Sequence, residues 1–574
     1  MASSDGLEKS PPRYDGGEAD NMEKSRARRK SSVVNPDVLT GEIYDERFDS
    51  TKRGLKSRHA QMIALRGTIG TGLFVGSGFT LSIGGPAFIL GSYIFMALLV
   101  WCIVTGISEV VAWLPTKGSS MSMFGWRYVS RPLGFAMGWL YWYSLGILVP
   151  YEITAAGLVI DYWHADVNIA VWISIIIVLI VGLNCLPVKY YGETEFWFAG
   201  TKVIMMTGLL ILSFILFWGG GPDQHGILGF RYWDHPGTVN VYLEKGSTGR
   251  FCALLYTLVL SAFPFTFAPE LLVATGGEME SPRRNLPTAA RRYFYRLVIF
   301  YIGCVLSIGV LAPYNDPALA GGGAGAKSSG FVVGITNAGI PVLSSIINAG
   351  IIISAWSSGN SFLYLSSRSL YSLALTGNAP SWFKGTPSRA PVETPAHIMS
   401  TACSKSGVPY RAVAVSALYT GLAYLNVANS GSTVFTWFVS LTNTSGFISW
   451  VCCTIVYLRF RKACKTQGIT DDQLPYHNKY MQLAMAGFIF LTLINGFNAF
   501  WPENWSASSF LTSYIGIPIF LLIYFGHRIY ARNEPCAHDP RDVDLQTGME
   551  EILSGETPHK VYDKWWKKAQ MIYE

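Results

Sequence analysis

The sequence predicts an all-α polytopic membrane protein with about twelve transmembrane helices. Half of its 574 residues are hydrophobic and only 14% are charged, whereas about a quarter are charged in an ordinary soluble protein. Apolar stretches of roughly 20 residues, long enough to cross a bilayer as a helix, recur along the chain. The net charge of +7 does not indicate nucleic-acid binding, because the basic residues lie in tails and loops beside the apolar stretches.

The apolar stretches set the expected organisation. Segment 1–58 is polar and is expected to be a disordered cytosolic tail, 59–530 forms the transmembrane domain, and 531–574 is a polar C-terminal tail in the cytosol. In chain order, the expected helices lie near 62–82, 86–108, 132–159, 168–187, 195–218, 251–275, 295–314, 340–375, 409–428, 434–459, 480–501 and 510–530.

Basic residues predict how these helices are oriented. Lysine and arginine cluster before the first expected span and in the loops after even-numbered spans, whereas the opposite loops contain few of them. Cytosolic loops carry this excess in membrane proteins, so we expect both termini in the cytosol. In the N-terminal tail, Lys9, Lys24 and Lys30 are candidate ubiquitin acceptors, which would make ubiquitin-ligase adaptors partners of the chain.

Two spans carry residues that interrupt a helix. The first contains Gly67–Gly72, the run GTIGTG, and the sixth contains Ala262–Glu270, with two prolines and a glutamate. Lipid cannot satisfy the backbone groups that a break exposes, so a break survives only where it lines a cavity or binds something polar. Glycines also permit close helix packing. However, two such runs five spans apart, at matching places in two five-helix units, favour the binding site of an inverted-repeat transporter.

An amino acid zwitterion matches both kinds of exposed backbone group. Its carboxylate is expected on the N–H groups of Gly70, Thr71 and Gly72, with the hydroxyls of Thr68 and Thr71 nearby, because helix N-termini bind anions.

The ammonium or imino nitrogen of the ligand is expected on carbonyl groups of the second run. The candidates are Phe263, Pro264 and Phe265, while Phe263, Phe265 and Phe267 would form the wall of a side-chain pocket or take part in ordinary helix packing. Ser354, in a polar stretch of the eighth span, would line the same cavity or bond between helices.

Ionisable residues at membrane depth are costly and are therefore candidates for function. Glu152 and Glu270 are candidate proton carriers, or structural partners of other buried polar groups. Lys202 could load and release a proton, or extend to the cytosolic surface. Arg66 has three possible roles: it extends to the same surface, pairs with one of the glutamates, or binds a carboxylate in a substrate side chain.

Several stretches resemble the fungal, yeast-type amino acid permeases of the amino acid–polyamine–organocation superfamily. They include RHAQMIALRGTIGTGLFVGSG, PELLVATGGEMESPRRNLPTAARR and NTSGFISWVCCTIVYLRFRKA, and the resemblance extends from about 50 to 530. FAPELLVATGGEMESPRRN and APYNDPALAGGGAGA are most similar to the proline-permease group, whereas VKYYGETEFW and GFRYW are shared with acidic-amino-acid permeases.

The resemblance implies proton-driven amino acid uptake across the fungal plasma membrane. It implies a five-plus-five inverted-repeat core with discontinuous helices 1 and 6, two extra helices, and alternating access. The proton would be the coupling ion, without another cofactor, and Lys202 matches a lysine that takes the place of a sodium ion in proton-coupled relatives. Arg66 departs from the family pattern, which has a small residue there, and is therefore a specificity candidate.

Three functions remain open at this point. Uptake of proline or another neutral amino acid is expected first, with an aspartate or glutamate permease as the alternative. The second alternative is an amino acid sensor of the same fold that does not transport. An enzyme is not expected, because no metal cluster, phosphate loop or nucleophile motif stands out in the sequence.

Overall fold

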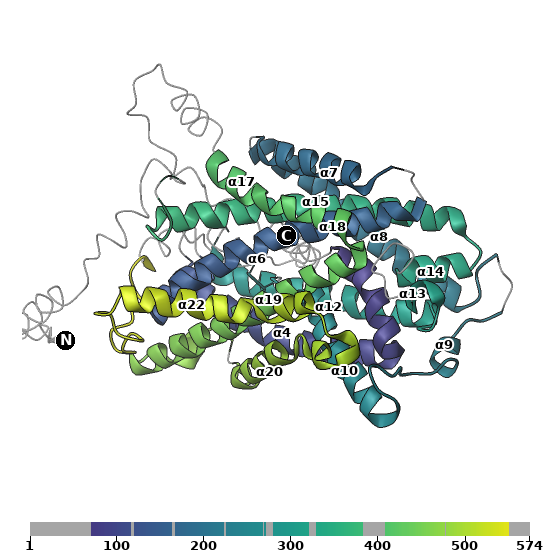
Figure 1. Cartoon of the computed structure of the whole chain (residues 1–574). Helices are drawn as coiled ribbons and strands as arrows, with labels where there is room; N and C mark the ends of the chain where they lie inside the picture. The colour runs from purple at the N-terminus through teal and green to yellow at the C-terminus, as the bar shows by residue number, and fades with distance from the viewer. Residues whose placement is uncertain are drawn as a thin grey trace, which may run out of the picture. The chain divides into compact units, whose positions relative to one another are not determined.

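A computed structural model describes residues 70–549, except 116–119, 164–166, 187, 223–225, 268, 271–278, 280, 321–328, 381, 383–407 and 477. These residues all belong to one compact unit, Arg53–Glu574. The elements in this part of the chain are helices (Figure 1), so the predicted all-α class is confirmed.

The helices follow one another along the chain as the apolar stretches predict. In order they are η2 (Gly72–Gly76), α4 (Ser77–Trp113), α5 (Met121–Tyr128), α6 (Arg131–Ile160), η3 (Asp161–Trp163), α7 (Ile169–Asn184), α8 (Val188–Phe217), α9 (Arg231–Asp234), α10 (Gly246–Ala262), η4 (Phe263–Phe265), α12 (Pro282–Leu311), α13 (Pro317–Ala320), α14 (Gly330–Asn337), α15 (Pro341–Leu375), α17 (Tyr410–Ala417), η7 (Leu418–Tyr424), α18 (Leu425–Ala428), α19 (Gly431–Thr466), η8 (Asp471–Gln473), α20 (Met481–Ile494), η9 (Phe497–Phe500), η10 (Pro502–Asn504), α21 (Ala507–Tyr514) and α22 (Gly516–Tyr530).

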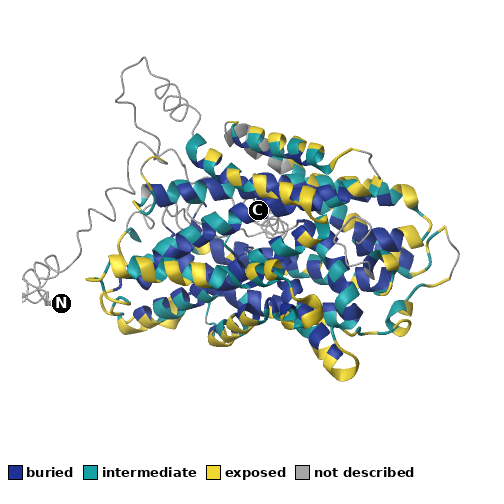
Figure 2. Ribbon diagram, in the orientation of Figure 1, coloured by how far each residue is buried: buried dark blue, intermediate teal, exposed yellow. Residues whose placement is uncertain are grey.

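The protein crosses the membrane many times. Among the described residues, eight helical segments are long and apolar enough to span a bilayer, and α21 with α22 forms a ninth that bends by 42°. α7 is apolar but shorter. Large apolar side chains such as Ile204 and Leu522 are more than 70% exposed, as expected for surfaces that contact lipid. Figure 2 shows that exposed residues recur along many of the helices.

The described part of the first expected span and the second expected span lie within one helical segment, Gly72–Trp113, that has a kink at Gly85. Its φ of 76° and ψ of 173° are not helical, and Pro86 follows. A Cβ atom here would lie 3.0 Å from the carbonyl oxygen of Thr238, so both the conformation and the space require glycine. Backbone bonds from Ala87 to Thr238 and from Asn240 to Gly84 fix the 238–240 loop against this turn.

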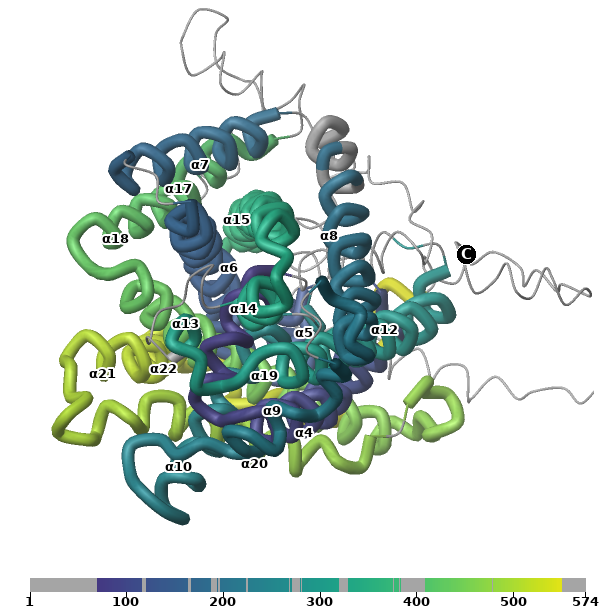
Figure 3. The backbone as a smooth tube through the Cα atoms, turned by 90° about the vertical axis from the view of Figure 1, so that its right-hand side faces the viewer, coloured from purple at the N-terminus to yellow at the C-terminus, as the bar shows by residue number. Residues whose placement is uncertain are grey.

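Two sets of helices form the body of the molecule. α4 packs mainly against α10 and α12, which we call the first helix group. α6 packs mainly against α15, which we call the second helix group, and α5 packs against α6. α19 contacts both α4 and α6, and α8 contacts α12 and α15. Figure 3 shows α6 and α15 side by side.

Several described segments differ from the expected helices: α5 and α14 were not expected, and the span near 510–530 is divided into α21 and α22. Two further differences have a cause in the local sequence. α12 begins at Pro282 rather than near 295, because proline suits the first turn of a helix and the basic stretch continues the helix beyond the apolar part. The expected span 409–428 is divided into α17, the 3₁₀-helix η7 and α18. Gly421, within η7, weakens an α-helix at this point.

Candidate functional site

The helix of the first span begins at Thr71, inside the apolar stretch that was expected to cross the membrane. It starts with the π-helical turn η2, a rare geometry that is frequent at functional sites. A Cβ atom on Gly70 would lie 2.8 Å from Oε1 of Glu152, and one on Gly72 would lie 2.8 Å from Cδ1 of Phe263. Both positions therefore require glycine for close packing.

Glu152 of α6 faces the start of this helix. The Thr71 hydroxyl donates a hydrogen bond of 2.7 Å to Oε2 of Glu152, and the Tyr151 hydroxyl lies 3.2 Å from the same Thr71 oxygen. Thr71 is fully buried and Glu152 is only 3% exposed. A carboxylate in this position interacts favourably with the positive end of the helix dipole.

Lys202 of α8 approaches the same region. Its Nζ donates a hydrogen bond of 2.7 Å to Oγ of Ser358 in α15, and its side chain is 2% exposed. The Cβ position of Gly70 lies 3.5 Å from that Ser358 oxygen and 2.8 Å from Glu152 Oε1. The structure therefore brings a buried cation and a buried carboxylate together around Gly70, with hydroxyl groups between and beside them.

The predicted break in the sixth span is confirmed. After α10 the chain forms the 3₁₀ turn η4, and Phe267 then has a φ of 59°, outside the helical region. Tyr301 of α12 donates a hydrogen bond of 2.7 Å to the Pro264 carbonyl, and Asn443 of α19 donates one of 3.1 Å to the Val259 carbonyl. Side chains from neighbouring helices thus pair with backbone groups at the break, as burial requires.

The aromatic residues of the break have different surroundings. The Phe263 ring centroid lies 4.6 Å from that of Tyr151, which also packs against Phe435 at 4.9 Å. Phe265 is fully buried and lies 4.8 Å from Tyr301, within the packing between α4 and α12. Phe263 is therefore beside Glu152 and the first break, whereas Phe265 points into the first helix group.

Glu270 belongs to a separate polar cluster. Its Oε1 accepts a hydrogen bond of 2.9 Å from Ser449, whose Oγ lies 2.9 Å from the Tyr141 hydroxyl. The Cys453 thiol lies 3.5 Å from that hydroxyl, and the Phe267 ring packs edge-on at 6.2 Å from Tyr141. Within the described residues Glu270 Oε2 has no hydrogen-bond partner. This cluster joins the second part of the broken span to α6 and α19.

The other predicted site residues are less completely placed. Ser354 is buried one turn before Ser358, and its Oγ has no hydrogen-bond partner in the part of the chain that the structure describes. Thr68 and Arg66 lie outside the described residues, so the three alternatives for Arg66 remain predictions.

The family profile described as "Amino acid permease" matches residues 59–537. The chain belongs to the amino acid permease family. A "Proline-specific permease" of Emericella nidulans is 44% identical over 545 residues, which cover 93% of this chain and 95% of the relative. The "Proline-specific permease" of Saccharomyces cerevisiae is 45% identical over 516 residues, covering 87% and 79%. The "Dicarboxylic amino acid permease" of Saccharomyces cerevisiae is 37% identical over 548 residues, covering 92% and 86%.

Some partners in this permease were not predicted from the sequence. Tyr151, Tyr301 and Asn443 make contacts at the breaks without standing in a glycine- or proline-rich run. A weak signal existed for two of them. Tyr151 precedes the intramembrane Glu152, and Asn443 begins the polar triplet NTS inside an apolar span. Tyr301 lies in an ordinary apolar run, where only the folded structure reveals its role.

A mainly apolar cavity of the permease adjoins the first break. It is lined by Gly72, Gly76, Phe79, Thr80, Leu260, Phe263, Phe435, Thr436 and Val439. Pockets with apolar walls and a few polar groups are typical of small-molecule sites. The contact of this cavity with Gly72 and Phe263 makes it a continuation of the site between the two breaks.

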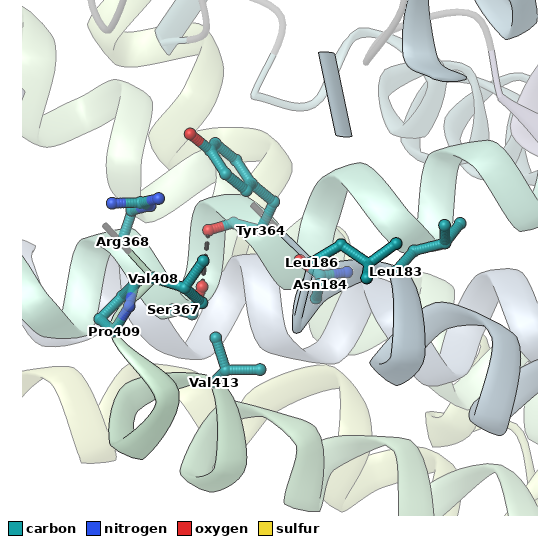
Figure 4. Close-up of a pocket in the computed structure, with 9 residues that line it drawn as sticks. All are labelled: Leu183, Asn184, Leu186, Tyr364, Ser367, Arg368, Val408, Pro409 and Val413. Carbon is teal, nitrogen blue, oxygen red and sulfur yellow. Dashed lines mark hydrogen bonds between the residues drawn. The ribbon is translucent and has the colours of Figure 1, made fainter. Parts of the chain in front are cut away.

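A second cavity lies between α7, α15 and α17, and none of its lining residues is a predicted site residue (Figure 4). It is lined by Leu183, Asn184, Leu186, Tyr364, Ser367, Arg368, Val408, Pro409 and Val413. The Asn184 amide donates a hydrogen bond of 2.8 Å to Asn360 of α15, and Ser367 donates one of 2.8 Å to the Tyr364 carbonyl. The first bond joins α7 to α15, and the second lies within α15.

Proposed function

We propose that this permease takes up proline, or another neutral L-amino acid, together with a proton across the plasma membrane by alternating access. The observation that carries the proposal is the contact between the two breaks. The Cβ position of Gly72 lies 2.8 Å from the Phe263 ring and 3.7 Å from Cγ of Pro264. A ligand with opposite charges a few bonds apart can therefore contact both breaks at once. Relatives named proline-specific permeases support proline as the first candidate.

The two breaks offer complementary groups to the ligand. Its carboxylate binds the N–H groups of Gly70, Thr71 and Gly72 at the helix start, with the Thr71 hydroxyl nearby. Thr68, which lies outside the described residues, stays a candidate from the sequence. Its positively charged nitrogen binds carbonyl groups of η4. A carbonyl oxygen has two lone pairs, so the Pro264 carbonyl can accept a second hydrogen bond beside that from Tyr301.

The hydrocarbon part of the ligand would pack against Phe263 and the cavity that adjoins it. The Phe263 ring touches Gly72 and stacks near Tyr151, so it forms a fixed wall next to the charged groups. Ser354 is a further candidate on the opposite side, because its buried hydroxyl has no partner among the described residues.

The proton, the only coupling species in the proposal, would be carried by the buried ionisable groups. Glu152 lies beside the proposed carboxylate site, so binding of the substrate anion favours a protonated Glu152 through repulsion between like charges. Lys202 lies on the other side of Gly70 and is positioned by Ser358. Glu270 is the third candidate, in its own cluster with Ser449.

In the proposed orientation both termini are cytosolic. The basic loops on the side where α4 ends and α12 begins support this assignment. Lys9, Lys24 and Lys30 would then be accessible to ubiquitin-ligase adaptors.

Uptake of labelled proline into permease-deficient yeast cells tests the proposal. Cells that express the chain should accumulate proline more strongly as the outside pH falls, and a protonophore should abolish the accumulation. A panel of twenty unlabelled amino acids then defines the substrate range. Equal uptake by cells with and without the chain, for every amino acid tried, would reject transport.

One observation favours a second candidate, an aspartate or glutamate permease. The 37% identical relative is named a dicarboxylic amino acid permease, and Arg66 is a cation close in sequence to the first break. In this case aspartate and glutamate should compete best, and Arg66→Gly should remove acidic-substrate uptake selectively. If Arg66 only extends to the membrane surface, the same variant should leave proline uptake intact.

A further inference from the structure

The chain beyond α22 folds back over the ends of the helices. We call residues 536–549 the C-terminal strap. Val543 is 4% exposed and Leu545 is 1% exposed, although both lie in a polar stretch of sequence. The strap lies at the ends where α4, α19 and α22 finish and α6 and α12 begin, which is the cytosolic side in the proposed orientation.

The strongest contact of the strap is with α5. Arg127 donates hydrogen bonds of 2.7 Å to Oδ2 of Asp544, 2.8 Å to the Asp544 carbonyl and 2.9 Å to the Thr547 carbonyl. Burial acts to raise the pKa of Asp544, but the Arg127 guanidinium and the backbone N–H groups of Thr547 and Gln546 outweigh burial and lower that pKa. Asp544 is therefore ionised at cytosolic pH and pairs with a charged partner.

Further contacts connect the strap to both α4 and the α5–α6 connection. The Trp113 indole, at the end of α4, donates a hydrogen bond of 3.0 Å to the Leu545 carbonyl. The backbone N–H of His538 donates one of 2.8 Å to the Val129 carbonyl, between α5 and α6.

The strap also contacts α19 and α12. The Gln467 amide, just after α19, donates hydrogen bonds of 3.1 Å to the Pro540 carbonyl and 2.7 Å to the Val543 carbonyl. Arg283, at the start of α12, lies 3.1 Å from the Met549 sulfur. The strap thus contacts helices that are far apart in the sequence.

We propose that the strap is a latch in the transport cycle, with Arg127 and Asp544 as its main positioning residues. Trp113 and Arg283 belong to the first helix group, whereas Arg127 lies on α5, which packs against α6 of the second group. A transporter that alternates its access must separate such groups on the cytosolic side. Separation breaks the contacts of the strap with one group, so the strap favours the cytosol-closed state.

This inference rests on the proposed transport function and makes a directional prediction. Arg127→Ala and Asp544→Asn weaken the latch and shift the population towards the cytosol-open state. Fewer molecules then face outwards, so the KM for external substrate should rise about two- to fivefold, and efflux from preloaded cells should become faster.

Two residues of the strap provide matched controls. Asp542→Asn makes the same charge change two positions away, and Arg541→Ala removes an arginine; both side chains are exposed. These variants should keep the wild-type KM and efflux rate, with all values normalised to the amount of permease at the cell surface. The proposal is overturned if Asp544→Asn or Arg127→Ala behaves like Asp542→Asn.

A second measurement does not depend on transport. In inside-out membrane vesicles, trypsin cleavage after Arg541 should be slower when the strap is docked, because burial of Val543 and Leu545 keeps the neighbouring chain from extending into the protease active site. Cleavage should be about two- to fivefold faster in Asp544→Asn than in the wild type or in Asp542→Asn. Equal cleavage rates would overturn the latch even in a chain that transports normally. If the wild type transports no amino acid, the proposed function fails, and the cleavage rates alone still decide whether Asp544 holds the strap in place.

Discussion

At the scale of single residues, the site depends on glycines that leave room for other side chains. The Cβ position of Gly70 lies 2.8 Å from Glu152, and that of Gly72 lies 2.8 Å from Phe263, whereas nothing lies within 4 Å of the Cβ position of Gly76. These three glycines stand within one short run, yet only Gly72 faces the second break, while Gly70 faces Glu152 and Ser358. The difference is invisible in the sequence, because it depends on residues from α6 and η4.

Substitution of these glycines should therefore have unequal effects. Gly70→Ala places a methyl group against the Glu152 carboxylate and should raise the KM for substrate about tenfold or more, which corresponds to about 1.4 kcal/mol or more. Gly91→Ala, the matched control on an exposed part of α4 where nothing lies within 4 Å of the Cβ position, should leave the KM unchanged and should not lower the amount of permease at the surface. Uptake kinetics over a range of proline concentrations measure both values. Equal KM values in the two variants would contradict the carboxylate assignment.

Lys202 allows a second test at this scale. Lys202→Ala should abolish accumulation against a gradient, because it removes the buried cation beside Ser358, while exchange of substrate across the membrane should persist. Lys245→Ala, which removes an exposed lysine in a loop, should change neither activity. Accumulation and counterflow in vesicles of defined pH separate the two readouts. Full accumulation in the Lys202 variant would remove this residue from the proton path.

At the scale of elements, the break in the sixth span shows how a discontinuous helix is stabilised. η4 ends α10, and the chain then leaves the helical conformation at Phe267. Carbonyl groups near the break accept hydrogen bonds from Tyr301 and Asn443, which belong to other helices. The residues of the sixth span therefore determine where the helix breaks, whereas hydrogen bonds from neighbouring helices stabilise the break.

Tyr301→Phe tests this dependence. Loss of the hydroxyl leaves the buried Pro264 carbonyl without its side-chain donor and should destabilise the permease by about 1–2 kcal/mol. Tyr314→Phe is the control, because the Tyr314 hydroxyl makes only an exposed contact of 3.4 Å with the Pro236 carbonyl. Thermal unfolding of the two purified variants in detergent, with and without proline, compares their stabilities. A Tyr301→Phe variant as stable as the control would show that the break is held by other contacts.

The C-terminal strap gives a pH-dependent expectation at the same scale. The folded pKa of Asp544 is lowered, so the stabilisation from its pairing with Arg127 is complete above the ordinary carboxyl pKa and is lost as the pH falls towards the lowered value. The difference in Tm between the wild type and Asp544→Asn should therefore be constant from about pH 5 to 8 and should shrink below about pH 4. A difference that stays the same at low pH would contradict the ionic contact.

At the scale of the whole molecule, the sequence predicts the helices well and their mutual contacts poorly. The length and hydropathy of the apolar stretches were sufficient to predict most of the spans. The helix-breaking residues were sufficient to predict the break at η4. In contrast, Thr71 and Glu152 are 81 positions apart, so their hydrogen bond depends on how α4 and α6 pack. The segment after 530 was predicted only as a polar tail, and its sequence does not show that Leu545 is buried against the helix ends. A few apolar residues and carbonyl groups suffice to dock it there.

The proposed orientation is a prediction for the whole chain. Epitope tags at either terminus should react with antibody only after the plasma membrane has been permeabilised, because the basic loops on that side favour the cytosol. A tag inserted after Gly237, in the loop before α10, should react in intact cells and serves as the control. Labelling of a terminal tag in intact cells would reverse the assignment.

The turn at Gly85 limits how the first two spans can move. Only one residue there departs from helical geometry, and the 238–240 loop is hydrogen-bonded against it. The outer ends of these spans therefore behave as a single stiff hairpin with a clamped tip. A tilt of one leg therefore has to be shared by the other.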